Sequence, residues 1–232
     1  MKYTFIIIAF FLMIQNSYGQ IVPQGFLVGP EIAADSVIIG TQIWKVKNLD
    51  VTTYNDATSI TNVTGNLTSI TSGAYSNYNE DAANAVTYGK LYNWYVASSG
   101  KACPVGWRVP SDADWIILTN YLATNGASSS STASTSNASV AGGVAKEIGT
   151  THWTTPNTSA SDAYGFTGLP GGWKDGSTST YLGLRGQFWS STDYSATVAG
   201  AAIRFTLYYD SNDLIRASDQ KYFAFSIRCI KN

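Results

Sequence analysis

Apolar and polar residues alternate near the C-terminal end of the chain, in residues 201–232. The apolar residues at every second position are Ile203, Phe205 and Leu207, and then Phe223, Phe225 and Ile227. Successive side chains of a strand point to opposite faces, so this period indicates half-buried strands. We expect three short strands, with a hairpin turn at 210–213 and another turn at 217–221.

A helical period occurs in the middle of the chain. Its apolar face consists of Trp115, Leu118 and Leu122, at positions i, i+3 and i+7. Ser111 is a favourable N-cap, and Asp114, three residues later, can complete a capping box. The pattern therefore predicts a helix over residues 112–123.

The remaining segments carry weaker signals. Residues 37–44 indicate a strand, a turn and a second strand, and 187–195 a strand with an exposed tip. Residues 84–98 fit either a helix or a pair of strands, because periodicity alone does not decide. The other expected features are loops over 52–80, a low-complexity loop over 124–143, a helical turn over 145–149 and glycine-rich turns over 164–176.

The first nineteen residues have the pattern of a secretory signal peptide. Lys2 precedes an apolar run over 5–14, and the cleavage-site pattern Ser17-Tyr18-Gly19 follows. The run is short for a membrane span, although an uncleaved anchor stays open. We expect a signal peptide over 1–19, an extended arm or linker over 20–36 and one domain over 37–232. The protein is then secreted or exposed at the cell surface, and does not span a membrane.

Composition narrows the classes of partner. Only 12% of the residues are charged and the formal net charge is −1, which excludes the basic field that nucleic-acid binding needs. Aromatic residues make up 13%. Tyrosine gives rigid contact area and serine and asparagine give adaptable hydrogen bonds, as in many binding surfaces. The same composition also suits a secreted β protein without a ligand.

The chain has two cysteines, Cys103 and Cys229. In an oxidising compartment an even number favours a disulfide. A catalytic thiol would need a base, and nothing places the single histidine, His152, near Cys103. We therefore predict the disulfide. We also expect Trp107, Trp115 and Trp189 to be core residues.

Six separated blocks together resemble the Fibrobacter succinogenes major paralogous domain family of secreted bacterial proteins. In chain order they are IGTQIWKVKNLDVTTY, YGKLYNWYVA, CPVGWRVPSDADWIILTNYL, GFTGLPGGWKDG, FWSSTDYS and FAFSIRCIKN. The resemblance covers residues 37–231 and implies an α+β, C-type-lectin-like fold: small twisted antiparallel sheets, one or two helices and long loops. The chain departs from the family pattern at Phe223–Phe225, where glycine is usual, and in the long serine-rich insert over 124–139.

The residues do not indicate an enzyme. Carboxylates are scattered, and no pair is placed as glycoside hydrolysis requires. No histidine and cysteine spacing indicates a metal, so we predict no catalytic residue and no metal site. Calcium stays open as a weak alternative, because lectin-like domains often bind it. The loop oxygens available for calcium belong to Asp175, Asp193, Asp210, Asn212 and Asp213.

A binding surface near the C-terminus agrees best with these patterns. If the two predicted turns lie at one end of the strands, they form a tyrosine-rich patch that suits a sugar or a protein. Its residues are Asp193, Tyr194, Tyr208, Tyr209, Asp210, Asn212, Arg216, Ser218, Asp219 and Tyr222. The expected function is a non-enzymatic binding domain for an extracellular glycan or protein. The alternatives are a structural or adhesin subunit that self-assembles through 20–36, a sequence-diversified receptor, or an enzyme.

Overall fold

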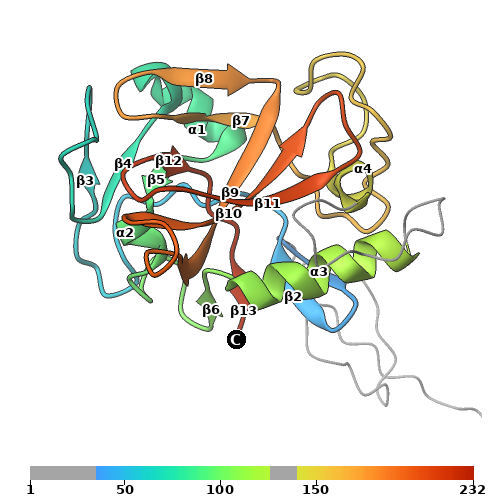
Figure 1. The fold of residues 1–232 in the computed structure, drawn as a ribbon, viewed down its shortest axis with the longest axis horizontal. Helices are drawn as coiled ribbons and strands as arrows, with labels where there is room; N and C mark the ends of the chain where they lie inside the picture. The colour runs from blue at the N-terminus through green and yellow to red at the C-terminus, as the bar shows by residue number, and fades with distance from the viewer. Residues whose placement is uncertain (1–34, 126–139) are drawn as a thin grey trace, which may run out of the picture. The chain divides into compact units, whose positions relative to one another are not determined.

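The computed structural model describes residues 35–125 and 140–232. These residues form an α+β unit with two open sheets and a few helices (Figure 1), which confirms the α+β class that was predicted. The predicted signal peptide lies outside the described residues, as do most of the arm over 20–36 and most of the serine-rich loop.

The two sheets contain most of the regular structure. The strands are β1 (Ser36–Ile39), β2 (Gln42–Lys45), β3 (Thr61–Asn62), β4 (Ala74–Ser76), β5 (Leu91–Asn93), β6 (Trp107–Arg108), β7 (Gly171–Lys174), β8 (Ser179–Leu182), β9 (Arg185–Asp193), β10 (Ala201–Tyr208), β11 (Leu214–Gln220), β12 (Ala224–Phe225) and β13 (Ile230–Lys231). The helices are η1 (Tyr78–Glu80, 3-10), α1 (Ala82–Tyr88), α2 (Trp94–Ala97), α3 (Asp112–Asn125) and α4 (Ala141–Ala145). One sheet has the order β1-β2-β13-β6. The other has nine strands in the order β11-β10-β9-β7-β12-β5-β4-β3, with β8 paired to β7.

Most neighbouring strands are antiparallel, as predicted, but β3–β4 and β7–β9 are parallel. The nine-stranded sheet is larger than the small sheets that we expected, and the described residues contain more helices than the predicted one or two. The extra helices are short, and α2 and α4 have four and five residues. Such short helices depend on their packing rather than on sequence propensity, so they give little sequence signal.

Helix α3 begins with the predicted capping box. The backbone N–H of Ser111 donates to the Asp114 carboxylate at 2.7 Å, and the Asp114 N–H donates to the Ser111 hydroxyl at 3.3 Å. Arg108 adds two hydrogen bonds to the same carboxylate, at 2.5 and 2.8 Å. The helix ends at Asn125, two residues after the predicted end.

Trp115 fixes helix α3 to both sheets. Its side chain is completely buried and stacks on Phe205 of β10, with ring centroids 4.9 Å apart. It also contacts Trp44 of β2 at 5.1 Å. Trp189 is likewise fully buried, so two of the three predicted core tryptophans are confirmed.

The prediction for Trp107 was wrong. Its side chain is only half-buried, with the Lys45 ammonium 4.3 Å from the ring centroid. Strand β6 forms the edge of the four-stranded sheet, so part of this ring faces solvent. An apolar residue beside a helix start does not show whether its strand is central or at an edge.

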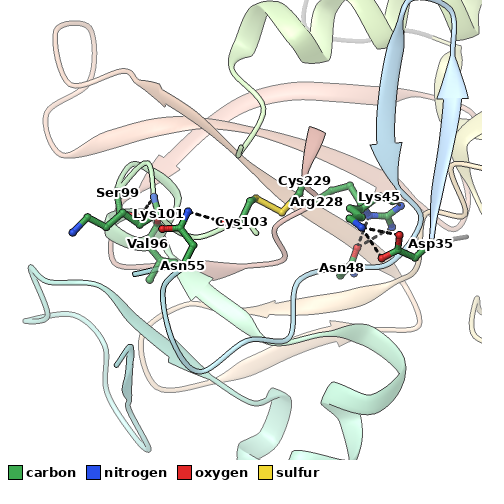
Figure 2. Close-up of a disulfide and its surroundings, with 10 residues drawn as sticks. All are labelled: Asp35, Lys45, Asn48, Asn55, Val96, Ser99, Lys101, Cys103, Arg228 and Cys229. Carbon is green, nitrogen blue, oxygen red and sulfur yellow. Dashed lines mark hydrogen bonds and ion pairs between the residues drawn. A yellow bond between two sulfur atoms is a disulfide. The ribbon is translucent and has the colours of Figure 1, made fainter. Parts of the chain in front are cut away.

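The predicted disulfide is present between Cys103 and Cys229, whose Cα atoms are 6.0 Å apart. Figure 2 shows the bridge between two polar contacts. On one side Asn55 donates to the carbonyl oxygen of Cys103 at 3.1 Å. On the other side Arg228, the neighbour of Cys229, donates to Asn48 at 2.8 and 3.0 Å. The bridge therefore attaches the loop before β6 to the chain just before β13.

Several predicted elements differ from the structure, and the segment over 52–80 that was expected to be loops contains β3, β4 and η1. Residues 84–98 contain the end of α1, then β5 and α2, so neither of the two alternatives was complete. The helical turn predicted at 145–149 lies earlier, at α4. The turn predicted at 217–221 was wrong, because residues 217–220 belong to β11. Pairing with β10 keeps this polar stretch extended although it lacks apolar alternation.

Candidate functional site

The hairpin of β10 and β11 has two different faces. Ile203, Phe205 and Leu207 are buried on one face, as their alternation predicts. Tyr208 is only half-buried and lies on the opposite face, as predicted. Arg204 shares that outer face, because side chains two positions apart in a strand point the same way.

The predicted tyrosine-rich surface is not one patch. Pairing of Ala201 with Gln220 and of Leu207 with Leu214 places the two turns at opposite ends of β11. At about 3.3 Å per residue they lie roughly 20 Å apart. One end holds Tyr208, Tyr209, Asp210 and Asn212, and the other holds Asp193, Tyr194, Asp219 and Tyr222, with Arg216 and Ser218 between them. The expectation that both turns lie together was wrong because 217–220 is strand.

The turn at 210–213 is held by a buried lysine. Lys146 is fully buried, and its ammonium donates to the carbonyl oxygens of Thr158, Tyr208 and Ser211 at 2.8, 2.8 and 2.9 Å. Burial lowers the pKa of Lys146 to about 8, against the opposing charge of Asp210. The charge of Asp210 therefore favours the protonated form of a lysine that holds the turn.

Two more predicted residues at this end also belong to the scaffold. The backbone carbonyl of Asn212 accepts a hydrogen bond from Gly143 at 3.1 Å, and Tyr209 packs against the core. A side chain at Gly142 would lie 2.1 Å from the Asp213 carbonyl oxygen, so α4 and this turn approach closely only because residue 142 is glycine.

The opposite end of β11 also contains internal contacts. Asp193 forms an ion pair with Lys221 at 2.7 Å. Hydrogen bonds from Lys221 and Ser195 lower the pKa of Asp193 to about 2. The Tyr222 ring lies edge-on to Phe223, with centroids 4.9 Å apart.

Arg216 and Ser218 line a hollow of about 260 Å³ together with Tyr194, Ile203 and Ala217. The Arg216 guanidinium donates to both oxygens of Asp112, at 2.6 and 2.7 Å. This hydrogen bonding with Asp112 raises the pKa of Arg216. The guanidinium therefore already has a carboxylate partner at the start of α3.

The outer face of the nine-stranded sheet carries a cluster that the sequence analysis did not single out. The guanidinium carbon of Arg185 lies 3.9 Å from the ring centroid of Tyr181 and 5.0 Å from that of Tyr208. Arg185 and Tyr208 are direct partners across β9 and β10. We call Tyr181, Arg185 and Tyr208 the tyrosine–arginine cluster. Of its residues Tyr181 is the most exposed, at 39%.

Further aromatic rings extend this cluster along the sheet. Trp173 of β7 lies nearly parallel to Tyr181, with centroids 6.3 Å apart and 21° between the planes. Phe223 contacts Trp173 edge-on at 4.9 Å. Both rings are only partly buried. Tyr181, Trp173 and Phe223 thus form a row of contacting rings, with the Arg185 guanidinium at its Tyr181 end.

Tyr181 has an unusual backbone. Its φ is 65°, in the left-handed region that bulky residues rarely adopt. A conformation of this kind costs about 1–3 kcal/mol and persists only where the surroundings enforce it. The contact between Tyr181 and Arg185 could have been predicted from the sequence. The two residues lie on either side of Gly183, and a short turn there brings them together.

The described residues contain no group of three or more histidine, cysteine, aspartate or glutamate side chains placed to hold a metal ion. Both cysteines are in the disulfide. His152 Nδ1 lies 2.9 Å from both oxygens of Glu147.

The sequence model described as the Fibrobacter succinogenes major domain matches residues 37–231. Neither the curated proteins nor the solved structures include a match to the chain. Within 35–125 and 140–232 no helix is both long enough and apolar enough to cross a membrane.

Proposed function

We propose that this chain, which belongs to the Fibrobacter succinogenes major domain family, is a non-enzymatic domain that binds carbohydrate outside the cytoplasm. The α+β unit would be a C-type-lectin-like fold, with the sheet face of β7 to β10 as its binding surface. This places the ligand beside Tyr208, as the sequence indicated, but on the side of Tyr181 and Trp173 rather than over the turns.

The exposed ring of Tyr181 is the observation that carries the proposal. A sugar has an apolar C–H face and a polar rim, which match an aromatic ring with hydrogen-bonding groups beside it. The Arg185 guanidinium lies against this ring, and the Trp173 ring lies nearly parallel to it. A strained backbone under an exposed tyrosine is common where a side chain must be presented to a ligand.

Calcium is not needed for binding at this surface. The tyrosine–arginine cluster contains no carboxylate, and Arg204 at its side is ion-paired to Asp219. Among the residues considered for calcium, Asp193 is paired with Lys221 and Asp213 accepts a hydrogen bond from Ser211. We therefore propose that the protein binds carbohydrate equally well in the presence of a calcium chelator.

The test is a glycan array probed with the purified protein, with and without EDTA. We expect binding in both conditions, and its loss in Tyr181→Ala and Tyr208→Ala. Tyr95→Ala is the matched control, since this half-buried tyrosine lies on α2, outside the cluster. Binding that survives both cluster variants would contradict the proposed surface.

Other results would support a different function. If no glycan is bound and the protein instead associates with itself in a manner that requires residues 20–36, a structural or adhesin subunit is the better description. Sedimentation at increasing concentration, with and without that segment, separates these two outcomes.

A further inference from the structure

We infer that the ligand carries a carboxylate and that Arg185 binds it, so that the proposed sugar is acidic, with a uronic acid residue at the cluster. This inference rests on the proposed function and specifies the chemical class of its ligand. It starts from the hydrogen bonding of the arginines.

Among the described residues Arg185 is the arginine without a hydrogen-bond acceptor for its side chain. The sequence has five arginines. Three are paired with carboxylates, namely Arg108 with Asp114, Arg204 with Asp219 and Arg216 with Asp112. Arg228 donates to Asn48 and to backbone carbonyls. Arg185 contacts only the two tyrosine rings through its charge.

Contacts with aromatic rings orient a guanidinium without using its N–H groups. Arginine presents five donors in a planar fork that matches a carboxylate, and it stacks readily on aromatic rings. The two rings at 3.9 and 5.0 Å restrict Arg185 before any ligand arrives. A ligand then loses less conformational freedom of the side chain on binding, which raises affinity.

The surroundings also favour an anion. Of the described carboxylates, none lies within ion-pair distance of Arg185, and Asp219 on the same face is already paired with Arg204. A carboxylate of the ligand would therefore not have to displace a protein carboxylate from Arg185. Hydrogen bonds between arginine and a carboxylate are stronger than those between neutral groups, and often bidentate.

The aromatic neighbours select a sugar acid over a simple anion. The exposed Tyr181 lies next to the cation, which suits a pyranose ring whose carboxylate is attached directly to it. A phosphate or sulfate group would use the charge of Arg185 but not these rings.

The experiment measures the affinity of the full chain for tetragalacturonate, for the same tetrasaccharide with its carboxylates reduced to alcohols, and for a sulfated tetrasaccharide. We expect the acid to bind about 10- to 100-fold more tightly than the reduced form, the range that a charged hydrogen bond contributes. In Arg185→Gln that difference should vanish. Lys47→Gln, which removes one exposed positive charge elsewhere, should keep it.

A second measurement follows ligand binding in the wild-type protein and uses a conservative variant only to assign the signal. In the wild-type protein, ¹⁵N spectra of the arginine Nε groups should show one signal that shifts with tetragalacturonate, identified as Arg185 by its absence in Arg185→Lys. If the wild-type protein binds neutral glycans equally well and this signal is unchanged, the acidic ligand is wrong while carbohydrate binding stands. Preference for the sulfated sugar, or binding of no glycan at all, would also overturn the inference.

Discussion

The ammonium of Lys146 donates a hydrogen bond to the carbonyl oxygen of Tyr208 at 2.8 Å. A fully buried cation in the loop after α4 thus fixes the end of the strand that presents one of the cluster tyrosines. Lys146 therefore connects the tyrosine–arginine cluster to the hydrogen-bonded interior below it.

Replacing this lysine should destabilise the whole fold. Lys146→Met removes the donor to three carbonyl oxygens, at Thr158, Tyr208 and Ser211. Buried acceptors left without a partner are costly, so we expect the free energy of unfolding to fall by about 2–4 kcal/mol. Urea denaturation measures it, with the exposed Lys47→Met as the control. A loss equal to that of the control would show that the carbonyls find other partners.

The two tryptophans of the CPVGWRVPSDADW segment should differ sharply. Trp115→Ala opens a cavity in the core, where Trp115 is completely buried, and should cost roughly 3–5 kcal/mol. Trp107→Ala removes a half-buried ring at a sheet edge and should cost about 1 kcal/mol. Guanidinium denaturation of both variants provides the comparison. Equal losses would contradict the edge position of β6.

Acid should weaken the start of α3. Burial raises the pKa of Asp114, but hydrogen bonds from Arg108 and Ser111 outweigh this and hold it at about 2, below the usual 3.8. The unfolded chain then binds the proton more readily, so the contribution of Asp114 is present above pH 4 and disappears as the pH falls toward 2.

The check for Asp114 is a comparison with Asp114→Asn. The urea midpoint of the wild-type protein should exceed that of the variant at pH 7, and the difference should shrink between pH 4 and pH 2. A difference that is constant over this range would show that the carboxylate has no special role in the native state.

The disulfide should protect both cysteines from alkylation. In the unreduced, denatured protein we expect no labelling of Cys103 or Cys229, and two labels after reduction, as read by mass spectrometry. Because the bridge closes a loop over 126 positions, the double variant Cys103→Ala, Cys229→Ala should lose about 5 kcal/mol by the loop-entropy estimate. Labelling without reduction would mean that the bridge is absent in the native protein.

Replacing Tyr181 by glycine should abolish carbohydrate binding but leave the stability of the fold almost unchanged. Glycine adopts positive φ freely, so Tyr181→Gly relieves backbone strain while it removes the ring. We expect the free energy of unfolding to change by less than about 1 kcal/mol, with carbohydrate binding lost. Tyr95→Gly, placed within helix α2, should instead lower stability and keep binding. A large loss of stability in Tyr181→Gly would show that the ring is structural.

Local sequence signals predicted the local features well. Ser111 and Asp114 are three residues apart, and their capping box forms as expected. The burial of Ile203, Phe205 and Leu207 in β10 was also predicted, because apolar residues at every second position mark the face of a strand that is buried. The disulfide was accessible through the even number of cysteines.

Features that depend on strand pairing were not accessible in this way. Arg185 and Tyr208 become neighbours only because β9 and β10 pair in one particular register, and nothing in either local stretch specifies it. The polar residues 217–220 resemble a turn, yet pairing with β10 extends them and separates the two ends of the predicted patch. The sequence therefore located one tyrosine of the cluster and missed its partners.

The last strand also bears on how the molecule is made. Strand β13 lies between β2 and β6, in the interior of the four-stranded sheet, and the residues just before it supply Arg228 and half of the disulfide. A chain that emerges N-terminus first, from a ribosome or through a translocation pore, cannot complete this sheet until residues 230–231 have emerged. A product truncated before β13 would lack the centre of the sheet rather than its edge, so it would not reach the native state.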